Sequence, residues 1–228
     1  MELKIMKPKD LISQNLKILI YGKSGVGKTY LAGSVNNALL IDLEKGSASV
    51  KNQDIDIVTA KDAREFREIL SYLEKDTKYE TIVIDSITRY SEMLFLALKS
   101  IYPDKKDSMN LWGDFDIASR KVIEKILSIN KNIVITSLEE EVTDDGILRK
   151  HPMYKASKFK VMLPSYFDIV SHLIVNDEGK RVMINDKTYD AIGKNRLRNS
   201  GIPDIIEEDN ELYSIQAILK QIKKRSNK

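Results

Sequence analysis

The run from Gly22 to Thr29, which reads Gly-Lys-Ser-Gly-Val-Gly-Lys-Thr, constrains this chain more than any other feature. It fits the P-loop pattern of a glycine, four residues and then Gly-Lys-Ser/Thr, in which successive backbone N–H groups surround a polyphosphate. Residues 16–21 are mostly apolar and predict a strand that ends at this loop. Residues 29–35 predict the helix whose N-terminus adds to the anion site. The sequence therefore predicts a site for a nucleoside polyphosphate.

Each residue type in the loop has an expected role. Lys28 should reach the outer phosphates of ATP, and the hydroxyl of Thr29 should bind Mg²⁺. The alternative is a glycine-rich turn with a surface lysine, and the flanking strand and helix argue against it. The predicted nucleotide-binding residues are Gly22, Lys23, Ser24, Gly25, Val26, Gly27, Lys28, Thr29 and Tyr30.

Two further predicted strands end in carboxylates. Residues 38–41 are apolar and lead to Asp42 and Glu44, and residues 81–84 lead to Asp85. Ligands of open α/β sheets bind at the carboxyl ends of the strands, so these acids are placed to act on the bound nucleotide. We expect Asp85 to hold Mg²⁺, directly or through water. Asp42 and Glu44 have an alternative interpretation, because acids at strand ends also cap helices and turns.

Composition narrows the class of protein. The chain has 228 residues, of which 42% are hydrophobic and 31% charged, as is ordinary for a soluble globular protein. The absence of cysteine excludes a disulfide framework and cysteine-based zinc sites. No apolar run approaches the roughly 18 residues of a membrane span, so we expect a cytoplasmic protein. The net charge of +3 is small, so nucleic-acid binding would depend on where the charges lie.

A basic and aromatic stretch follows the strand predicted at residues 132–136. Cations can neutralise phosphates and aromatic faces can stack on bases, as binding of single-stranded nucleic acid requires. The alternative is a solvated loop in which Phe159 and Phe167 pack inward, and the residues alone leave both interpretations open. The cations are Arg149, Lys150, Lys155, Lys158 and Lys160, and the aromatic residues are Tyr154, Phe159, Tyr166 and Phe167.

The last third of the chain predicts an edge hairpin and a second cationic row. Residues 168–175 and 181–184 predict two antiparallel strands that close one edge of the sheet. Lys194, Arg196 and Arg198 alternate, so in an extended segment they would share a face and could bind a phosphate. The alternative is a solvated edge strand that carries cations against aggregation. We expect a lead-in at residues 1–16, one domain at 17–206, and a helix with a basic tail at 207–228.

Together these motifs resemble the RecA-type P-loop ATPase core. Among RecA-type proteins the chain is most similar to the small phage-encoded nucleotide-binding proteins, some of which are single-strand annealing recombinases. The resemblance spans residues 17–206 and rests on residues 22–29, 41–44, 82–86 and 193–196. It implies an α/β fold whose mainly parallel central sheet is flanked by helices and has an antiparallel hairpin at its C-terminal edge. It also implies an oligomer of identical subunits, as a ring or a filament, but the lead-in is too short for the oligomerisation domain of RecA, so the mode of assembly does not carry over.

The resemblance assigns roles to residues that match the family's motifs. Glu44 would polarise the attacking water, while Asp85 would hold Mg²⁺. Lys194 and Arg196 would reach across the subunit interface to the γ-phosphate of a neighbour. The segment from Arg149 to Lys160 would be the mobile DNA-binding loop.

The expected function is that of a Mg²⁺-dependent ATPase that binds single-stranded DNA in phage-type homologous recombination or strand annealing, in the host cytoplasm if the chain is phage-encoded. Its expected catalytic residues are Glu44, Lys28, Lys194 and Arg196. A single-stranded-DNA-binding protein is a further candidate partner. The alternative is a nucleotide-dependent switch or loader that binds a protein without DNA-stimulated hydrolysis. One departure is that Ser137, Leu138 and Glu139 stand where RecA carries a glutamine that senses the γ-phosphate.

Overall fold

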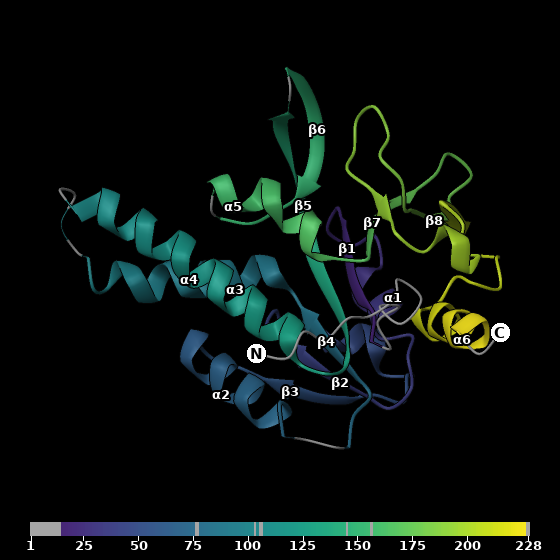
Figure 1. The fold of residues 1–228 in the computed structure, drawn as a ribbon, viewed down its shortest axis with the longest axis horizontal. Coiled ribbons are helices and arrows are strands. Elements are labelled where there is room, and N and C mark those ends of the chain that lie inside the picture. Colours follow the sequence, from purple (N-terminus) through teal and green to yellow (C-terminus); the bar gives the residue numbers. More distant parts are fainter. Residues whose placement is uncertain are drawn as a thin grey trace, which may run out of the picture.

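The computed structural model describes residues 15–75, 78–102, 104, 107–144, 146–155 and 157–226 as a central sheet with helices on both faces (Figure 1). Among these residues, no helix combines the length and the apolarity needed to cross a membrane. The strands are β1 (Lys17–Gly22), β2 (Ala38–Asp42), β3 (Asp56–Thr59), β4 (Thr81–Asp85), β5 (Asn132–Asp144), β6 (Ile147–Pro152), β7 (Ile169–Val175), β8 (Arg181–Ile184), β9 (Lys194–Asn195) and β10 (Ile205–Glu207). The α-helices are α1 (Lys28–Ala32), α2 (Ala63–Leu73), α3 (Ile87–Lys99), α4 (Ser108–Ser128), α5 (Ser157–Met162) and α6 (Ile215–Ser226). Short 3₁₀ helices are η2 (Ser47–Val50), η4 (Leu163–Tyr166) and η5 (Arg198–Ser200).

The sheet is parallel through most of its width. Its strand order is β3-β2-β4-β5-β1-β7-β8-β10, and β6 and β9 pair outside this path with β5 and β7. Strands β3 to β7 along this order run parallel, whereas β8 and β10 run antiparallel to their neighbours. This arrangement confirms the predicted α/β fold with a mainly parallel sheet and an antiparallel edge. The predicted β7–β8 hairpin forms, but β10 covers its outer side.

The parallel strands bring the loop and the acids to one edge of the sheet. Residues 18–21 of β1 are fully buried, because a parallel sheet is covered on both faces. In the β2–β4 register Asp42 lies opposite Asp85, at the carboxyl ends of both strands. The P-loop leaves β1 at Gly22, which lies opposite Leu138 of β5. The P-loop, Asp42 and Asp85 therefore lie at the same edge of the sheet.

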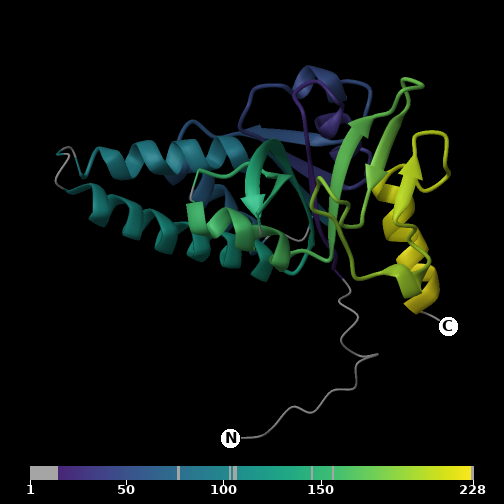
Figure 2. The same cartoon turned by 90° about the horizontal axis from the view of Figure 1, so that it is seen from above.

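Alternating residues of the strands build a separate core on each face of the sheet. Leu19 and Tyr21 point into the core formed with α2, α3 and α4. Ile18 and Ile20 point into the core formed with α1 and α6. Helices α3 and α4 pack along each other and extend together beyond the sheet (Figures 1 and 2).

The helix predicted for residues 207–228 begins too early. Residues 205–207 form β10, in which Ile206 is buried opposite Met183 of β8. Pairing with β8 keeps this segment extended, and turns occupy residues 208–214 before α6 begins at Ile215. The end of the predicted tail, residues 227–228, and most of the predicted lead-in, residues 1–14, lie outside the described residues.

The segment expected to be a mobile loop that binds DNA instead forms packed secondary structure in its described part. Strand β5 continues well past the predicted end at Thr136 and pairs with β6. Helix α5 and η4 follow, and the side chains of Tyr154, Phe159 and Phe167 are at most 1% exposed. The inward packing of Phe159 and Phe167 is therefore confirmed, and these rings offer no face on which a base could stack.

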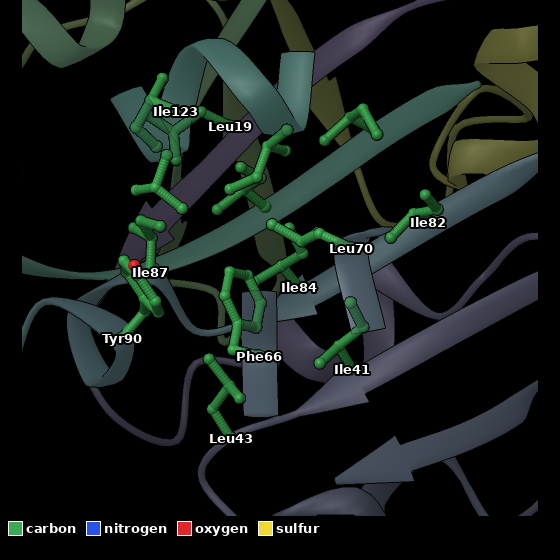
Figure 3. Packing of buried hydrophobic residues seen from close by; sticks show 14 of the residues in the cluster. Leu19, Ile41, Leu43, Phe66, Leu70, Ile82, Ile84, Ile87, Tyr90 and Ile123 are labelled. Atoms are coloured by element: carbon green, nitrogen blue, oxygen red, sulfur yellow. The ribbon is translucent and has the colours of Figure 1, made fainter. Parts of the chain in front are cut away.

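The core around α2 supplies a stability test. Phe66 is fully buried and its ring centroid lies 4.6 Å from that of Tyr90, beside Ile84 and Leu70 (Figure 3). We expect Phe66→Ala to lower the free energy of unfolding by about 3–5 kcal/mol, because it removes a large buried side chain and leaves a cavity. Denaturant unfolding followed by circular dichroism measures this change.

The matched control lies on the same helix. Tyr72 of α2 is 68% exposed, so Tyr72→Ala should change the free energy of unfolding by no more than about 0.5 kcal/mol. Equal losses in the two variants would contradict the assignment of this face of α2 to the core.

Candidate functional site

The glycines of the P-loop are required by close approaches and by backbone conformation. A Cβ on Gly22 would lie 2.3 Å from the carbonyl oxygen of Leu173 in β7, which leaves room only for glycine. Gly27 has a φ of 101°, in the left-handed region that side chains rarely adopt, and α1 begins at the next residue. These two positions fix how the chain leaves β1 and enters α1.

Lys28 is held inside the loop. Its Nζ donates hydrogen bonds to the carbonyl oxygens of Gly22 at 3.0 Å and Lys23 at 2.7 Å, and the residue is 9% exposed. Burial lowers the pKa of the Lys28 ammonium, while the charges of Asp85 and Glu44 act to raise it. An ammonium held by two carbonyls beside two acids can exchange these partners for phosphate oxygens.

Asp85 is a buried carboxylate held by two hydroxyls. Its Oδ2 accepts a hydrogen bond from Thr29 Oγ1 at 2.7 Å, its Oδ1 accepts one from the hydroxyl of Thr136, and the residue is 3% exposed. Burial raises the pKa of Asp85, the two hydrogen bonds lower it, and the charge of Glu44 raises it further.

These residues fit a Mg²⁺ ion. A hydroxyl and a carboxylate, Thr29 and Asp85, present the hard oxygen ligands that Mg²⁺ prefers, and Mg²⁺ usually takes only one or two from the protein. A divalent cation here would also favour the charged form of the buried Asp85.

Asp42 anchors the turn that presents Glu44. Its Oδ1 accepts hydrogen bonds from the backbone N–H of Glu44 at 3.0 Å and of Gly46 at 3.3 Å, and its Oδ2 accepts one from Ser47 at 3.1 Å. Asp42 is 1% exposed, and both of its carboxylate oxygens accept hydrogen bonds from the backbone. It therefore acts as a turn residue, which was the alternative interpretation of this acid. The carboxylate of Glu44 accepts a hydrogen bond from the hydroxyl of Ser86, next to Asp85.

Two cavities lie near the candidate site. One of about 510 Å³ opens beside Glu44 and is also lined by Lys61 and Arg89. The other, of about 440 Å³, is lined by residues 23–26 of the loop and by the side of β7 that carries His172. The structure thus brings Lys28, Thr29, Glu44 and Asp85 to one open edge of the sheet.

A hydrogen-bonded pair that was not predicted from the sequence joins the strands that flank β1. Nε2 of His172 in β7 lies 2.9 Å from Oε2 of Glu139 in β5, and the His172 ring stacks on Tyr21 with centroids 4.8 Å apart. Burial lowers the pKa of His172, and Glu139 acts to raise it. Ser137, in contrast, is fully buried with its Oγ 3.1 Å from Thr88 Oγ1, so Glu139 is the polar side chain of this region that adjoins the loop.

Arg181 of β8 also contacts the P-loop and was not predicted. Its Nε donates to the carbonyl oxygen of Val26 at 3.1 Å, and its Nη1 lies 3.2 Å from Oε2 of Glu208. A Cβ on Gly27 would lie 2.9 Å from the Nε of Arg181, so this contact adds to the demand for glycine.

The cationic row is divided and lies away from the P-loop of its own chain. Nζ of Lys194 donates to Ser165 O at 2.8 Å, and Arg196 donates to the same oxygen at 3.2 Å. Arg198 begins η5 and pairs with Asp186 and Asp204, so the expected common face of all three cations is wrong.

The position of Arg196 follows from the strand pairing. Its N–H donates to Asp168 O, and Asp168 accepts from the N–H of Lys17 at the start of β1. Lys17 precedes Gly22 by the length of β1, which is roughly 15 Å of strand. Arg196 thus lies near the start of β1, whereas the P-loop follows the end of β1.

The cations expected to contact nucleic acid have partners within the chain wherever their side chains are described. Arg149 is 7% exposed, so little of it could reach a ligand without rearrangement. The side chain of Lys158, in α5, lies outside the described part. The contacts are Arg149 Nε to Tyr189 O at 3.2 Å, Lys150 Nζ to Asp190 at 3.2 Å, Lys155 Nζ to the Phe95 ring centroid at 4.5 Å, and Lys160 Nζ to Glu140 at 2.8 Å.

Comparison with known proteins gives a family match. A family model described as an AAA domain matches residues 14–197, which include the P-loop, Glu44 and Asp85. No curated protein matches the chain. The matched range covers well over half of the 228 residues. The chain therefore belongs to the AAA-domain family, a family of P-loop ATPases.

Proposed function

We propose that this protein is a Mg²⁺-dependent ATP hydrolase in which Glu44 orients the attacking water. The observation that carries the proposal is the convergence of Lys28 at the start of α1, Glu44 in the turn after β2, and Asp85 at the end of β4. Lys28 and the loop would hold the phosphates, and Thr29 and Asp85 would hold the metal ion. When bound, Mg²⁺ neutralises charge on the outer phosphates. Glu44 would accept a proton or hydrogen bond from water in line with the γ-phosphate.

We further propose that the site is of the RecA type. Glu44 lies in the turn after β2, and β2 pairs directly with β4, which ends in Asp85. The residue after Asp85 is Ser86 rather than a second acid. These positions support a water-orienting acid supplied by the neighbouring strand, as the resemblance to RecA implies.

The role of Glu44 is tested by Glu44→Gln. We expect kcat to fall at least about 100-fold, because the amide cannot act as a base, while the affinity for ATP is retained. Phosphate release measures the rate and equilibrium titration with ATP measures binding. Lys28→Met is the companion variant and should weaken ATP binding itself. Undiminished hydrolysis by Glu44→Gln would exclude Glu44 as the water-orienting group.

Single-stranded DNA is the partner that we propose, with a role in recombination or annealing of the phage type. The basic segment starts in β6, which pairs with β5, and β5 runs beside the P-loop strand. DNA bound to the β5–β6 hairpin would therefore act on a strand that is paired with β1, which leads into the P-loop. Since the nearby rings are buried, contact would be made through the DNA backbone, chiefly by the exposed Lys155 and by Lys150.

A specific observation favours the alternative of a switch or loader that binds a protein. Lys150 and Lys160 are already paired with Asp190 and Glu140, so DNA phosphates would have to replace existing partners. A protein-binding switch needs no such exchange. The two functions differ in whether DNA changes the rate of hydrolysis.

The ATPase rate with and without single-stranded DNA across a salt series separates them. We expect stimulation that weakens as salt rises, because phosphate contacts release counterions. Replacing Lys150 and Lys155 by Ala should reduce the stimulation, whereas Lys99→Ala, an exposed position on α3, should not. A rate unaffected by DNA at every salt concentration would favour the switch.

We also propose that Lys194 and Arg196 act on the nucleotide of a neighbouring subunit in a ring or filament. The direction of their side chains supports this, because both donate to the carbonyl oxygen of Ser165 and Arg196 lies near the start of β1, away from its own P-loop. Arg196 is 54% exposed in its side chain and could contact another subunit. Hydrolysis would then require assembly.

Mixing two inactive variants tests the shared site. Glu44→Ala subunits retain Arg196, and Arg196→Ala subunits retain Glu44, so some mixed interfaces would contain both groups. We expect hydrolysis above the sum of the separate variants. As a control, a mixture of Glu44→Ala and Lys28→Met subunits should recover no hydrolysis. Both changes damage the P-loop side of the shared site, so no interface in this mixture contains an intact P-loop side. No recovery at any Glu44→Ala to Arg196→Ala ratio would contradict the proposal.

A further inference from the structure

We propose that Ser86 is a positioning residue for hydrolysis, because its hydroxyl holds the Glu44 carboxylate in place. This inference rests on the proposed role of Glu44 and goes beyond it by naming the group that sets its geometry. Ser86 follows Asp85 directly, is 1% exposed, and donates its hydroxyl proton to Oε1 of Glu44.

The second hydrogen bond of Ser86 fixes the direction of the first. The backbone N–H of Arg89 donates to Ser86 Oγ at 3.2 Å, which makes Ser86 the N-cap of α3. A hydroxyl has one proton and can accept at its lone pairs. With Arg89 as donor, the proton of Ser86 is available for Glu44.

Glu44 needs such a contact because only its backbone is otherwise fixed by the turn. Asp42 accepts the N–H of Glu44 and anchors the turn, but the residue itself is exposed and its side chain has several rotatable bonds. The bond from the buried Ser86 joins this exposed carboxylate to a rigid element, the start of α3. The side chain is thereby held in a single direction beside Asp85.

The position of Ser86 also links the two carboxylates of the site. Asp85 and Ser86 are consecutive, and the N–H of Leu43, just before Glu44, donates to the carbonyl oxygen of Asp85 at 2.7 Å. The metal-side acid and the water-orienting acid are therefore tied together through both backbone and side chain. Small errors in such spacing reduce rates strongly, because the reacting groups must be aligned.

Ser86→Ala tests the inference. We expect kcat for ATP to fall about 10-fold or more, with the affinity for ATP changed less than about 2-fold, because ground-state phosphate contacts are untouched. Ser86→Thr keeps the hydroxyl and should retain most of the rate. A double-mutant cycle with Glu44→Gln should show that Ser86→Ala has no further effect once Glu44 is replaced.

Loss of the helix cap is controlled separately. Asp62 caps α2 by accepting from the N–H of Arg64 and Glu65, so Asp62→Ala removes a helix cap while leaving the Ser86–Glu44 hydrogen bond in place. It should lower thermal stability as a cap substitution does and leave kcat unchanged. All variants are compared at a temperature at which circular dichroism shows each to be folded.

The outcomes separate the inference from the proposed function. If Ser86→Ala leaves kcat unchanged, or lowers it equally in the presence and absence of Glu44→Gln, the positioning role is wrong. If Glu44→Gln alone leaves hydrolysis unchanged, the proposed role of Glu44 fails first. A loss in Ser86→Ala that disappears in the Glu44→Gln background supports the inference.

Discussion

The arrangement of the site depends on one buried carboxylate, that of Asp85. Burial alone would favour its neutral form, and the hydroxyls of Thr29 and Thr136 oppose that effect. Inside a protein such hydrogen bonds are electrostatically strong, and a missing partner is correspondingly costly. Because Thr29 belongs to the P-loop and Thr136 to β5, the carboxylate of Asp85 joins three elements: the P-loop, β4 and β5.

The charged groups around Asp85 are mostly negative. Glu44 and Asp42 add negative charge, and the buried ammonium of Lys28 lies close enough to Asp85 and Glu44 for their charges to raise its pKa. Asp42 satisfies its own oxygens with backbone N–H groups of the following turn, which leaves Glu44 and Asp85 as the carboxylates that can respond to a ligand. The P-loop and these carboxylates thus meet at one edge of the sheet, where a polyphosphate and a cation would each relieve part of the field of the other.

Local patterns were enough to predict most of the sheet but not the contacts between distant segments. The apolar runs before Gly22 and Asp85 predicted buried parallel strands, because such strands are covered on both faces. The polar continuation of β5 looked like a loop, since its partner β6 becomes evident only after pairing. Arg181 approaches Val26 from 155 residues away, and no local signal marks such a contact.

The same reasons explain which site residues could be predicted. Recognisable motifs contain Lys28, Thr29 and Asp85, and the spacing within these motifs predicts where each side chain lies relative to the loop. The role of Asp42 could not be decided from the sequence. An acid at the end of a strand can face a ligand or bond to the backbone of the next turn, and the local sequence is the same in both cases. The pair of Glu139 and His172 joins β5 to β7 across the end of β1, and only the strand order brings these residues together.

The C-terminal helix shows that the folded unit is longer than the sequence range shared with the family. The match ends at residue 197, yet α6 buries Ile215 and Ile218 in the core that lies under α1. The backbone of α6 also bonds to the segment after α1, where the N–H of Ile215 donates to Ser34 Oγ at 3.0 Å. Residues beyond the matched range therefore brace, from the far side, the helix that begins at Lys28 in the P-loop.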